Sequence, residues 1–327
     1  MKTVVIGLGS MGRRRVRLLK QLYTNIEVIG LDINEERRKA AEIEFSIRTY
    51  YNLGCIDEKI DDELKTAFIC TSPLSHSKII QECLSRGYHI FTEINLNDDG
   101  YEANIRLAKD NGLVLFLSST PMYRKEIEYI KSRVLKSEHR KTYIYHVGQY
   151  LPDWHPWENY KDFFVSNKRT SGCREIMAIE FPWLFDIYGV PLTWVTNKYK
   201  ISSLDIDYND VIQIMFTHPN GCSGIIQFDV VSRKAIRNFE CVAEDLYISW
   251  DGTPNGLFQY DYNKKEGKPI SMYNYIDKSN EYSDSIIENA YMDEIKVFFD
   301  VVQGLTIPRY TFMKDKEILR IINEIGN

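Results

Sequence analysis

The sequence predicts an α/β plus α+β protein with two domains. The first, residues 1–120, is expected to be a doubly wound parallel sheet, and the second, residues 121–327, an open, mostly antiparallel sheet. A chain of 327 residues is about twice the length of a typical domain. Short β-branched runs alternate with helical patterns in the first third, and longer runs with period-two character follow.

The first domain is expected to wind a parallel sheet with crossover helices, because each apolar run leads into an amphipathic stretch. The expected strands are Thr3–Ile6, Glu27–Leu31, Ala67–Cys70, Tyr88–Phe91 and Leu113–Leu117. The expected helices are Met11–Tyr23, Glu35–Glu44, Ser75–Arg86 and Tyr101–Asn111.

In the second domain, Val211–Thr217 and Gly224–Val230 have strand character and are joined across Pro219-Asn220-Gly221. This turn sequence predicts an antiparallel hairpin. Ser285–Val302 and Lys314–Ile325 have the pattern of amphipathic helices. We expect the chain to cross the domain boundary more than once, with the C-terminal helix packing back on the first domain.

Composition argues against several classes of partner. The net charge of -5 offers no basic field for nucleic acid, and the apolar runs are too short to span a bilayer. The six cysteines form no C-x-x-C pair and have no His-rich neighbour, so neither a metal site nor a disulfide framework is expected. A cytoplasmic protein with a small-molecule substrate fits these features.

Residues Gly7-Leu8-Gly9-Ser10-Met11-Gly12 place G-x-G-x-x-G directly after the first strand and at the start of a helix. Backbone amides there can hold the pyrophosphate of a dinucleotide. Asp32 ends the second strand, where a carboxylate accepts hydrogen bonds from the adenosine ribose. Because an acid repels a 2′-phosphate, the pattern predicts a Rossmann domain that prefers NAD(H) to NADP(H). Arg13-Arg14-Arg15 can approach the phosphates, but a solvated helix face is the favoured interpretation.

Further motifs follow the later strands. Thr71-Ser72-Pro73 precedes His76, Glu93 follows the strand that ends at Phe91, and Tyr291–Ile295 precede a final helix. With the glycine motif, these segments resemble the Gfo/Idh/MocA family of NAD(P)-dependent oxidoreductases. The resemblance implies that Thr71, Ser72, Pro73, His76 and Glu93 contact the cofactor. It also implies oxidation or reduction at the CH–OH groups of carbohydrates, and homodimers or homotetramers formed through the outer side of the C-terminal sheet.

The chain departs from this family at the proton-transfer positions. Ile94 and Asn95 stand where the family has lysine and proline. In its second signature, Glu175 takes the place of an aspartate, Ile179 that of the histidine and Pro182 that of the last aspartate. Hydride transfer at a carbinol requires a proton acceptor, which isoleucine cannot be. Either other residues do this work or the chemistry differs.

The connection from Gly148 to Tyr160 gathers aromatic and ionisable side chains, as functional loops often do. A sugar can stack on tryptophan while carboxylates bind its hydroxyls, and a histidine with a pKa near 6.5 can shuttle a proton. The segment is similar to one in a family branch linked to surface-polysaccharide synthesis. Alternatively, the loop only buries its tryptophans and its histidine caps backbone. The candidates are His155 and Glu158 for catalysis, and Asp153, Trp154, Trp157 and Tyr160 for substrate binding.

Arg174, Glu175 and Glu180 form a second group, on the helix that faces the nicotinamide in the family. Arg174 and Glu180 are candidates for substrate binding and Glu175 for catalysis, since arginine binds carboxylates and phosphates well. A salt-bridge network that supports the helix is the alternative. Three functions remain open: an NAD(H)-dependent oxidoreductase acting on a sugar or sugar derivative, a non-catalytic NAD-binding sensor or accessory subunit, and a reductase of an imine-type acceptor.

Overall fold

The computed structural model describes residues 2–56, 65–155, 158–278 and 285–326, in two units. The first unit comprises Met1–Ser119 and Tyr291–Glu317, and the second comprises Thr120–Ala290 and Ile318–Asn327. Residues 291–317, which the expected bounds placed in the second domain, thus group with the first unit, and the chain passes between the units more than once. The reason is apolar packing, because Phe298 lies against Phe68, Phe91 and Phe116 of the first sheet with ring centroids 5.3–5.6 Å apart.

A six-stranded parallel sheet, in the order β3-β2-β1-β4-β5-β6, forms the first unit and confirms the predicted doubly wound fold. Buried apolar side chains on both faces of the central strands explain their near-continuous hydrophobic sequences. The short edge strand β3 has one exposed and two half-buried residues, so no apolar run predicts it. The strands are β1 (Lys2–Ile6), β2 (Glu27–Leu31), β3 (Arg48–Tyr50), β4 (Lys65–Ile69), β5 (His89–Thr92) and β6 (Leu115–Leu117).

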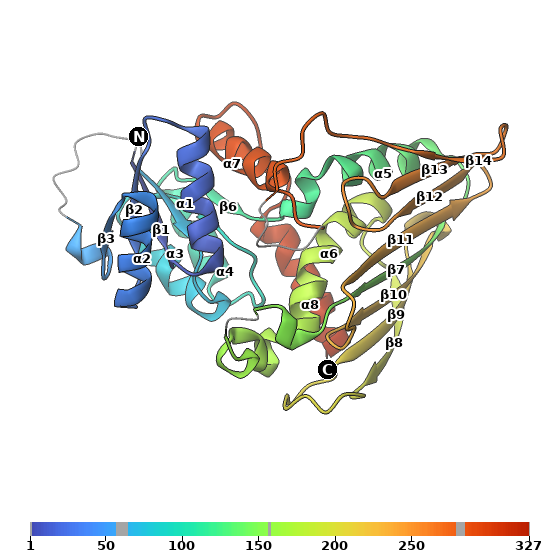
Figure 1. The fold of residues 1–327 in the computed structure, drawn as a ribbon, viewed down its shortest axis with the longest axis horizontal. Coiled ribbons are helices and arrows are strands. Elements are labelled where there is room, and N and C mark those ends of the chain that lie inside the picture. Colours follow the sequence, from blue (N-terminus) through green and yellow to red (C-terminus); the bar gives the residue numbers. More distant parts are fainter. Residues whose placement is uncertain (1, 57–64, 156–157, 279–284, 327) are drawn as a thin grey trace. The chain divides into compact units, whose positions relative to one another are not determined.

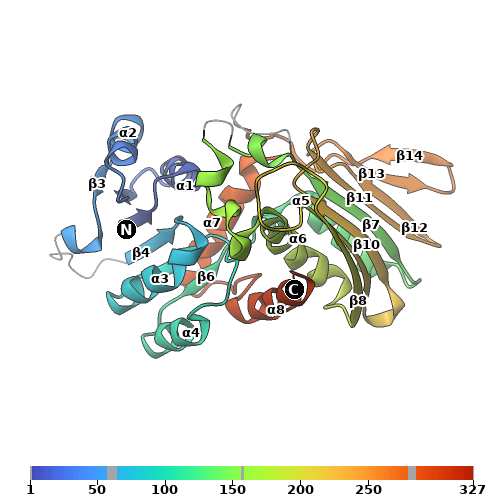
Figure 2. The ribbon, with the colours of Figure 1, turned by 90° about the horizontal axis from the view of Figure 1, so that it is seen from below.

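Helices cover both faces of this sheet. Figure 2 shows α1 and α2 on one side and α3 and α4 on the other. All of these helices lie within a few residues of their predicted bounds. They are α1 (Ser10–Leu22), α2 (Glu35–Phe45), α3 (His76–Ser85) and α4 (Tyr101–Asp110), with α7 (Glu288–Val302) and α8 (Phe312–Gly326) following near the end of the chain.

The second unit is built on an eight-stranded sheet in the order β14-β13-β12-β11-β7-β10-β9-β8. Its neighbours are antiparallel except for β7 and β10, which confirms the expected mostly antiparallel sheet. The predicted hairpin joins β9 to β10, with positive φ at Asn220 and Gly221. The strands are β7 (Thr142–Gly148), β8 (Thr193–Tyr199), β9 (Val211–Thr217), β10 (Ser223–Asp229), β11 (Ile236–Ala243), β12 (Leu246–Trp250), β13 (Leu257–Asp261) and β14 (Glu266–Pro269).

One face of this sheet packs against α5 (Lys125–Lys136) and α6 (Gly172–Tyr188), as Figure 1 shows. Glu180 anchors α6 to the strands. Its fully buried carboxylate accepts hydrogen bonds from Tyr145 Oη at 2.6 Å and Trp183 Nε1 at 2.8 Å. It also pairs with Arg237 Nη2 at 2.8 Å. These contacts balance the cost of burying the charge.

Short 3-10 helices occupy several connections. They are η1 (Leu53–Cys55), η2 (Pro73–Ser75), η3 (Thr120–Tyr123), η4 (Leu151–Asp153), η5 (Tyr160–Asp162), η6 (Phe164–Ser166), η7 (Lys168–Thr170) and η8 (Pro219–Gly221). No helix in the described ranges is long and apolar enough to cross a membrane. The six cysteines are all free thiols.

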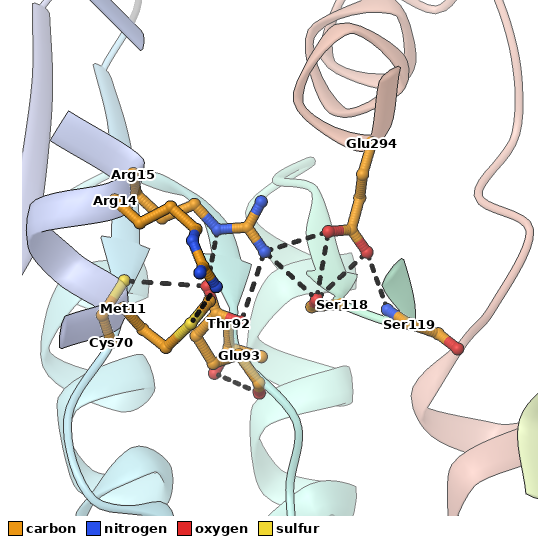
Figure 3. A network of polar contacts seen from close by, with 9 residues as sticks. All are labelled: Met11, Arg14, Arg15, Cys70, Thr92, Glu93, Ser118, Ser119 and Glu294. Carbon is orange, nitrogen blue, oxygen red and sulfur yellow. Dashed lines mark hydrogen bonds and ion pairs between the residues drawn. The ribbon is translucent and has the colours of Figure 1, made fainter. Parts of the chain in front are cut away.

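A buried ion cluster joins α1 to the ends of β5 and β6 and to α7 (Figure 3). Arg15 is fully buried, and its guanidinium lies 2.6 Å from Glu93 Oε1 and 2.9 Å from Glu294 Oε2. Ser118 Oγ and Ser119 N donate to Glu294 at 3.0 and 2.7 Å. Burial alone lowers the pKa of Arg15, but the two carboxylates outweigh it and raise that pKa above its usual value. The charge of Arg15 is therefore permanent.

The favoured interpretation of the arginine run as a solvated face is wrong for two of its residues. Arg14 and Arg15 are buried, and the Arg14 guanidinium lies 4.6 Å from the centre of the Tyr291 ring. Only Arg13 is exposed, in an ion pair with Glu44. Arg14 and Arg15 are buried because α7, from the far end of the sequence, packs over this side of α1 and places Tyr291 and Glu294 against them.

Replacing Arg15 by methionine is expected to destabilise the protein by about 3–5 kcal/mol, since it leaves two carboxylates buried without their shared cation. Urea unfolding measures this. Arg13→Met on the same helix is the matched control, because its pair with Glu44 is exposed and worth about 0–1 kcal/mol. Equal losses in the two variants would contradict a stabilising role for the cluster.

Candidate cofactor and substrate sites

Two glycines, Gly7 and Gly12, let the backbone of the turn after β1 pack closely against neighbouring backbone. Gly7 has a φ of +90°, and a Cβ there would lie 2.8 Å from the carbonyl carbon of Cys70. A Cβ on Gly12 would lie 1.7 Å from the carbonyl oxygen of Gly7. No side chain fits at either position, so α1 starts directly against the ends of β1 and β4.

Gly9 differs from these two glycines because it faces open space. A Cβ on Gly9 would meet nothing closer than Arg37 Nη1, at 3.8 Å. Gly9 is the N-cap of α1, the amides of Ser10 and Met11 follow it, and the first turn of the helix carries no acidic residue. This bare helix start fits the pyrophosphate of a dinucleotide, since a side chain at Gly9 would fill the space that the phosphates need.

Asp32 lies at the end of β2, beside this turn, and is nearly buried. Leu8 N donates to its Oδ2 at 2.7 Å and Asn34 N donates to its Oδ1 at 2.8 Å. Each carboxylate oxygen can accept a further hydrogen bond. The two amides fix the orientation of the carboxylate, which leaves it able to accept from ribose hydroxyls.

Thr71, Ser72 and Pro73 follow β4 and lead into α3, where His76 is buried. His76 Nε2 lies 2.9 Å from Thr71 O, and its Nδ1 lies 2.7 Å from Asn95 Oδ1. Burial lowers the pKa of His76, which favours a neutral ring. The ring nitrogens of His76 therefore serve to hold the loop after β4.

Glu93 reaches the same edge of the sheet from β5, and its carboxylate is paired with Arg15. Cys70 Sγ lies 3.9 Å from Glu93 Oε1, and burial raises the pKa of this thiol well above its usual value. All the predicted cofactor residues thus lie along the carboxyl ends of β1, β2, β4 and β5, the edge where doubly wound sheets bind ligands.

The loop after β7 in the second unit is well packed. Leu151 N donates to Val230 O at 2.9 Å, and Trp154 Nε1 donates to Gln149 O at 3.0 Å. His155 Nδ1 lies 2.7 Å from Glu158 Oε1, and the centre of its ring lies 4.2 Å from that of Phe163, with the two rings tilted by 45°. The structure therefore brings the side chains of His155 and Glu158 into contact.

The other loop candidates occupy different surroundings. Asp153 is exposed at the end of η4, and Tyr160 Oη accepts from Asp205 N at 3.2 Å. Trp157 lies outside the described residues.

The first turn of α6 meets this loop at Gly172. A Cβ there would lie 2.8 Å from Val230 Cγ1 and 3.3 Å from Trp154 Cη2, so only glycine allows the contact. Arg174 Nη2 donates to Asn323 Oδ1 at 2.6 Å. Glu180 lies further along α6, and its contacts with Tyr145, Trp183 and Arg237 are internal to the unit.

Glu175 is the most unusual ionisable group in the second unit. Its Oε2 is inaccessible to solvent and has no hydrogen-bond partner among the described residues. Burial raises the pKa of this carboxyl to about 8. A carboxylic acid that stays protonated near neutral pH can donate a proton to a substrate, and such pKa shifts often mark functional sites.

Sequence reasoning missed several residues that shape these sites. Asn95 orients His76, and Tyr208 holds the start of α6 by donating to Val165 O at 2.8 Å and accepting from Gly172 N at 3.3 Å. Neither residue belongs to a recognisable motif. The departure of Asn95 from the family proline is the one signal that marks it.

Known proteins resemble this chain in sequence mainly over its first unit. Residues 1–118 match the GFO_IDH_MocA family model, described as an oxidoreductase family with an NAD-binding Rossmann fold. A 4-carboxy-2-hydroxymuconate-6-semialdehyde dehydrogenase from Sphingobium is 23% identical over 141 residues. This match covers 42% of the chain and 44% of the dehydrogenase, so it spans less than half of that protein.

Two solved structures share the fold along nearly the whole chain. UDP-N-acetylglucosamine 3-dehydrogenase from Acidithiobacillus ferrooxidans has a TM-score of 0.77 at 16% identity, covering 100% of this chain and 96% of that one. A putative NADPH-dependent oxidoreductase from Desulfitobacterium hafniense has a TM-score of 0.82 at 9% identity, covering 99% and 94%. Residues 1–118 of this chain are therefore similar to the GFO_IDH_MocA oxidoreductase family, and the chain shares the fold of these two structures.

Proposed function

We propose that the protein is an NAD(H)-dependent oxidoreductase that acts on a CH–OH group of a sugar or sugar derivative. The observation that carries this proposal is the open glycine turn at Gly9 with the oriented carboxylate of Asp32 beside it. The names of structural neighbours support a sugar-type substrate, since they include a UDP-N-acetylglucosamine 3-dehydrogenase and a levoglucosan dehydrogenase. The acid at Asp32 favours NAD(H) over NADP(H).

When bound, the nicotinamide supplies or accepts the hydride. In the carbonyl-reduction direction, the substrate oxygen needs a proton, and Glu175 can donate one because its raised pKa keeps it protonated near neutral pH. In the oxidation direction, the same carboxylate accepts the proton. Glu175 precedes Ile179, which replaces the family histidine, by about one turn on the same face of α6. It can therefore take over the role of the missing histidine.

The loop after β7 supplies the remaining proposed contacts. A sugar ring can stack on Trp154 while Asp153 and Tyr160 bind hydroxyl groups, and Arg174 can bind a carboxylate or phosphate. The His155–Glu158 pair is the second candidate for proton transfer, because a carboxylate holds the imidazole at 2.7 Å. Variants of the two candidates separate their roles.

The protein is further proposed to be a homodimer or homotetramer. Val195, Met215, Ile225 and Ile144 are cross-strand partners along β8, β9, β10 and β7. Their side chains are 67%, 59%, 48% and 54% exposed, on the sheet face opposite α6. A row of exposed apolar side chains on a sheet marks an interaction surface, and a second copy of the same sheet offers a matching row.

The cofactor site is tested by titrating NADH with the protein and following the fluorescence of NADH. Turnover is then measured on a panel of free, phosphorylated and nucleotide-linked sugars, including precursors of surface polysaccharides. Gly9→Ala is expected to weaken NADH binding about tenfold to a hundredfold, since overpacking costs about 1–3 kcal/mol. Gly326→Ala is the control, because a Cβ there meets nothing within 4 Å. Tight binding without turnover on any sugar would favour the non-catalytic alternative, and absence of NADH binding would overturn the proposal.

Glu175→Gln is expected to lower kcat about 10²–10⁴-fold, because the variant cannot transfer the proton. Carbonyl reduction by the parent is expected to stay level below a pH of about 8 and to fall above it, as Glu175 loses its proton. His155→Ala and Glu158→Gln are the matched variants. Loss of the pH dependence in these two, but not in Glu175→Gln, would assign proton transfer to the His155–Glu158 pair.

A stability measurement checks the Glu175 pKa without a substrate. Because the pKa rises from 4.5 to about 8 on folding, the contribution of the neutral carboxyl is complete below pH 4.5 and is lost as the pH rises toward 8. Glu175→Gln lacks this loss. As the pH rises through this range, the urea midpoint of the parent should therefore fall relative to that of Glu175→Gln. A difference between the two midpoints that does not change with pH would rule out the raised pKa.

The oligomer is tested by Met215→Lys combined with Ile225→Lys, which places charges in the exposed apolar row. Dissociation to monomers is expected, since each buried apolar side chain is worth about 1.5–3 kcal/mol. Size-exclusion chromatography with light scattering reads the mass. Leu135→Lys on α5 is the control, because Leu135 is also exposed, at 61%, but lies off the sheet. A monomeric parent would refute the proposed assembly.

A further inference from the structure

A hollow of about 400 Å³ lies in the second unit, between the short helices η6 and η7 and the connection from β8 to β9. Its volume falls within the range of small-molecule sites, which is about 300–1,000 Å³. None of its lining residues belongs to the loop candidates after β7 or to α6, where the proposed function places the reacting group. The lining residues are Ser166, Asn167, Lys168, Asp205, Ile206 and Asp207.

The two walls of the hollow are bound to each other at two places. Tyr160 Oη accepts from Asp205 N at 3.2 Å, and Lys161 forms an ion pair with Asp205. Tyr208 Oη donates to Val165 O at 2.8 Å. Asp205 and Tyr208 stand on either side of the lining residues 206 and 207, so the hollow is held open by contacts within the chain.

Each wall is also fixed internally. Lys200 Nζ donates to the carbonyl oxygens of Leu204 and Ile206, both at 2.7 Å. On the other wall, Asn167 Oδ1 accepts from Arg169 N at 2.8 Å. Because these contacts already order the walls, a ligand would lose little binding free energy to the ordering of loops.

The side chains of the lining offer both donors and acceptors of hydrogen bonds. Lys168 and the NH2 group of Asn167 can donate, Asp207 can accept, and the hydroxyl of Ser166 can do both. Ile206 is half-buried and adds an apolar contact. Small-molecule sites combine apolar contact with a few polar groups in this way.

The charges of the lining favour a neutral ligand. Asp205 is already paired with Lys161, so Lys168 and Asp207 remain, and their charges are opposite. An anion such as phosphate would meet two carboxylates, those of Asp205 and Asp207. A sugar ring is neutral, its hydroxyls donate and accept, and its C–H face can lie on Ile206.

From this lining we propose that the hollow binds a second sugar ring of the substrate, beyond the ring that reacts. The inference rests on the proposed function, since it requires a sugar substrate at α6 and the loop after β7. Tyr208 joins the two places, because its Oη also accepts from Gly172 N at 3.3 Å, at the start of α6. Burial raises the pKa of Tyr208, and the nearby carboxyl of Glu175 adds to this rise. A substrate of two linked rings can therefore reach from Glu175 to the hollow.

The experiment measures dissociation constants of neutral sugars by saturation-transfer NMR, with NADH present. The probes are the monosaccharides D-glucose and D-galactose and the disaccharides maltose, cellobiose and lactose. The parent is expected to bind at least one disaccharide about tenfold or more tightly than the monosaccharides, because the second ring adds hydrogen bonds to charged groups.

Asp207→Asn and Lys168→Met each remove one charged group from the hollow. Either variant is expected to weaken binding of that disaccharide about tenfold and to leave the monosaccharides unchanged. Asp162→Asn is the matched control, because Asp162 is an exposed aspartate of η5 that does not line the hollow. It should leave every constant unchanged.

Disaccharides that bind no more tightly than the monosaccharides, or that lose no affinity in Asp207→Asn and Lys168→Met, would overturn the inference. An equal loss for both classes of sugar in these variants would overturn it too, because the hollow would then hold the reacting ring. NADH binding and turnover by the parent would uphold the proposed function in each of these cases. A parent that binds no NADH would refute the proposed function, and the inference with it.

Discussion

The close contact between Gly12 and the carbonyl oxygen of Gly7 is the constraint on which the first unit depends. It allows α1 to begin directly against the ends of β1 and β4, with its amides toward the open side at Gly9. That placement carries Arg15, one turn further along the helix, into the interior. There it meets carboxylates from β5 and α7. The open glycine turn and the buried ion cluster are thus two consequences of one backbone contact.

The ion cluster also explains why a segment from the end of the chain belongs to this unit. Glu294 brings a second carboxylate to Arg15, and Ser118 and Ser119 donate to it from the end of β6. Phe298 adds apolar contact with the three central rings of the sheet. The ion pair of Glu294 with Arg15 and the packing of Phe298 on the sheet both hold α7 in place.

In the second unit, α6 carries two glutamates, Glu180 and Glu175, in different surroundings. Glu180 is buried, accepts hydrogen bonds from Tyr145 and Trp183 and forms an ion pair with Arg237, so it stabilises the packing of helix on sheet. Glu175, earlier on the same helix, has one solvent-inaccessible oxygen without a hydrogen-bond partner among the described residues, and burial of this carboxyl raises its pKa to about 8. Tyr145 on β7 and Arg237 on β11 reach Glu180, whereas no described residue forms a hydrogen bond with Oε2 of Glu175. Proton chemistry is therefore proposed for Glu175 alone of the two.

The sequence by itself determined the doubly wound sheet, the hairpin from β9 to β10 and the glycine turn with Asp32. These features depend on local periodicity, on turn residues and on a motif whose spacing is short. Tertiary structure decided the environment of each charge: that Arg14 and Arg15 are buried while Arg13 is not, that Asn95 orients His76, and that His155 lies on Glu158. It also decided which unit receives residues 291–317. The physical reason is that burial and pairing depend on partners distant in sequence, such as Glu294 for Arg15, and local pattern carries no record of them.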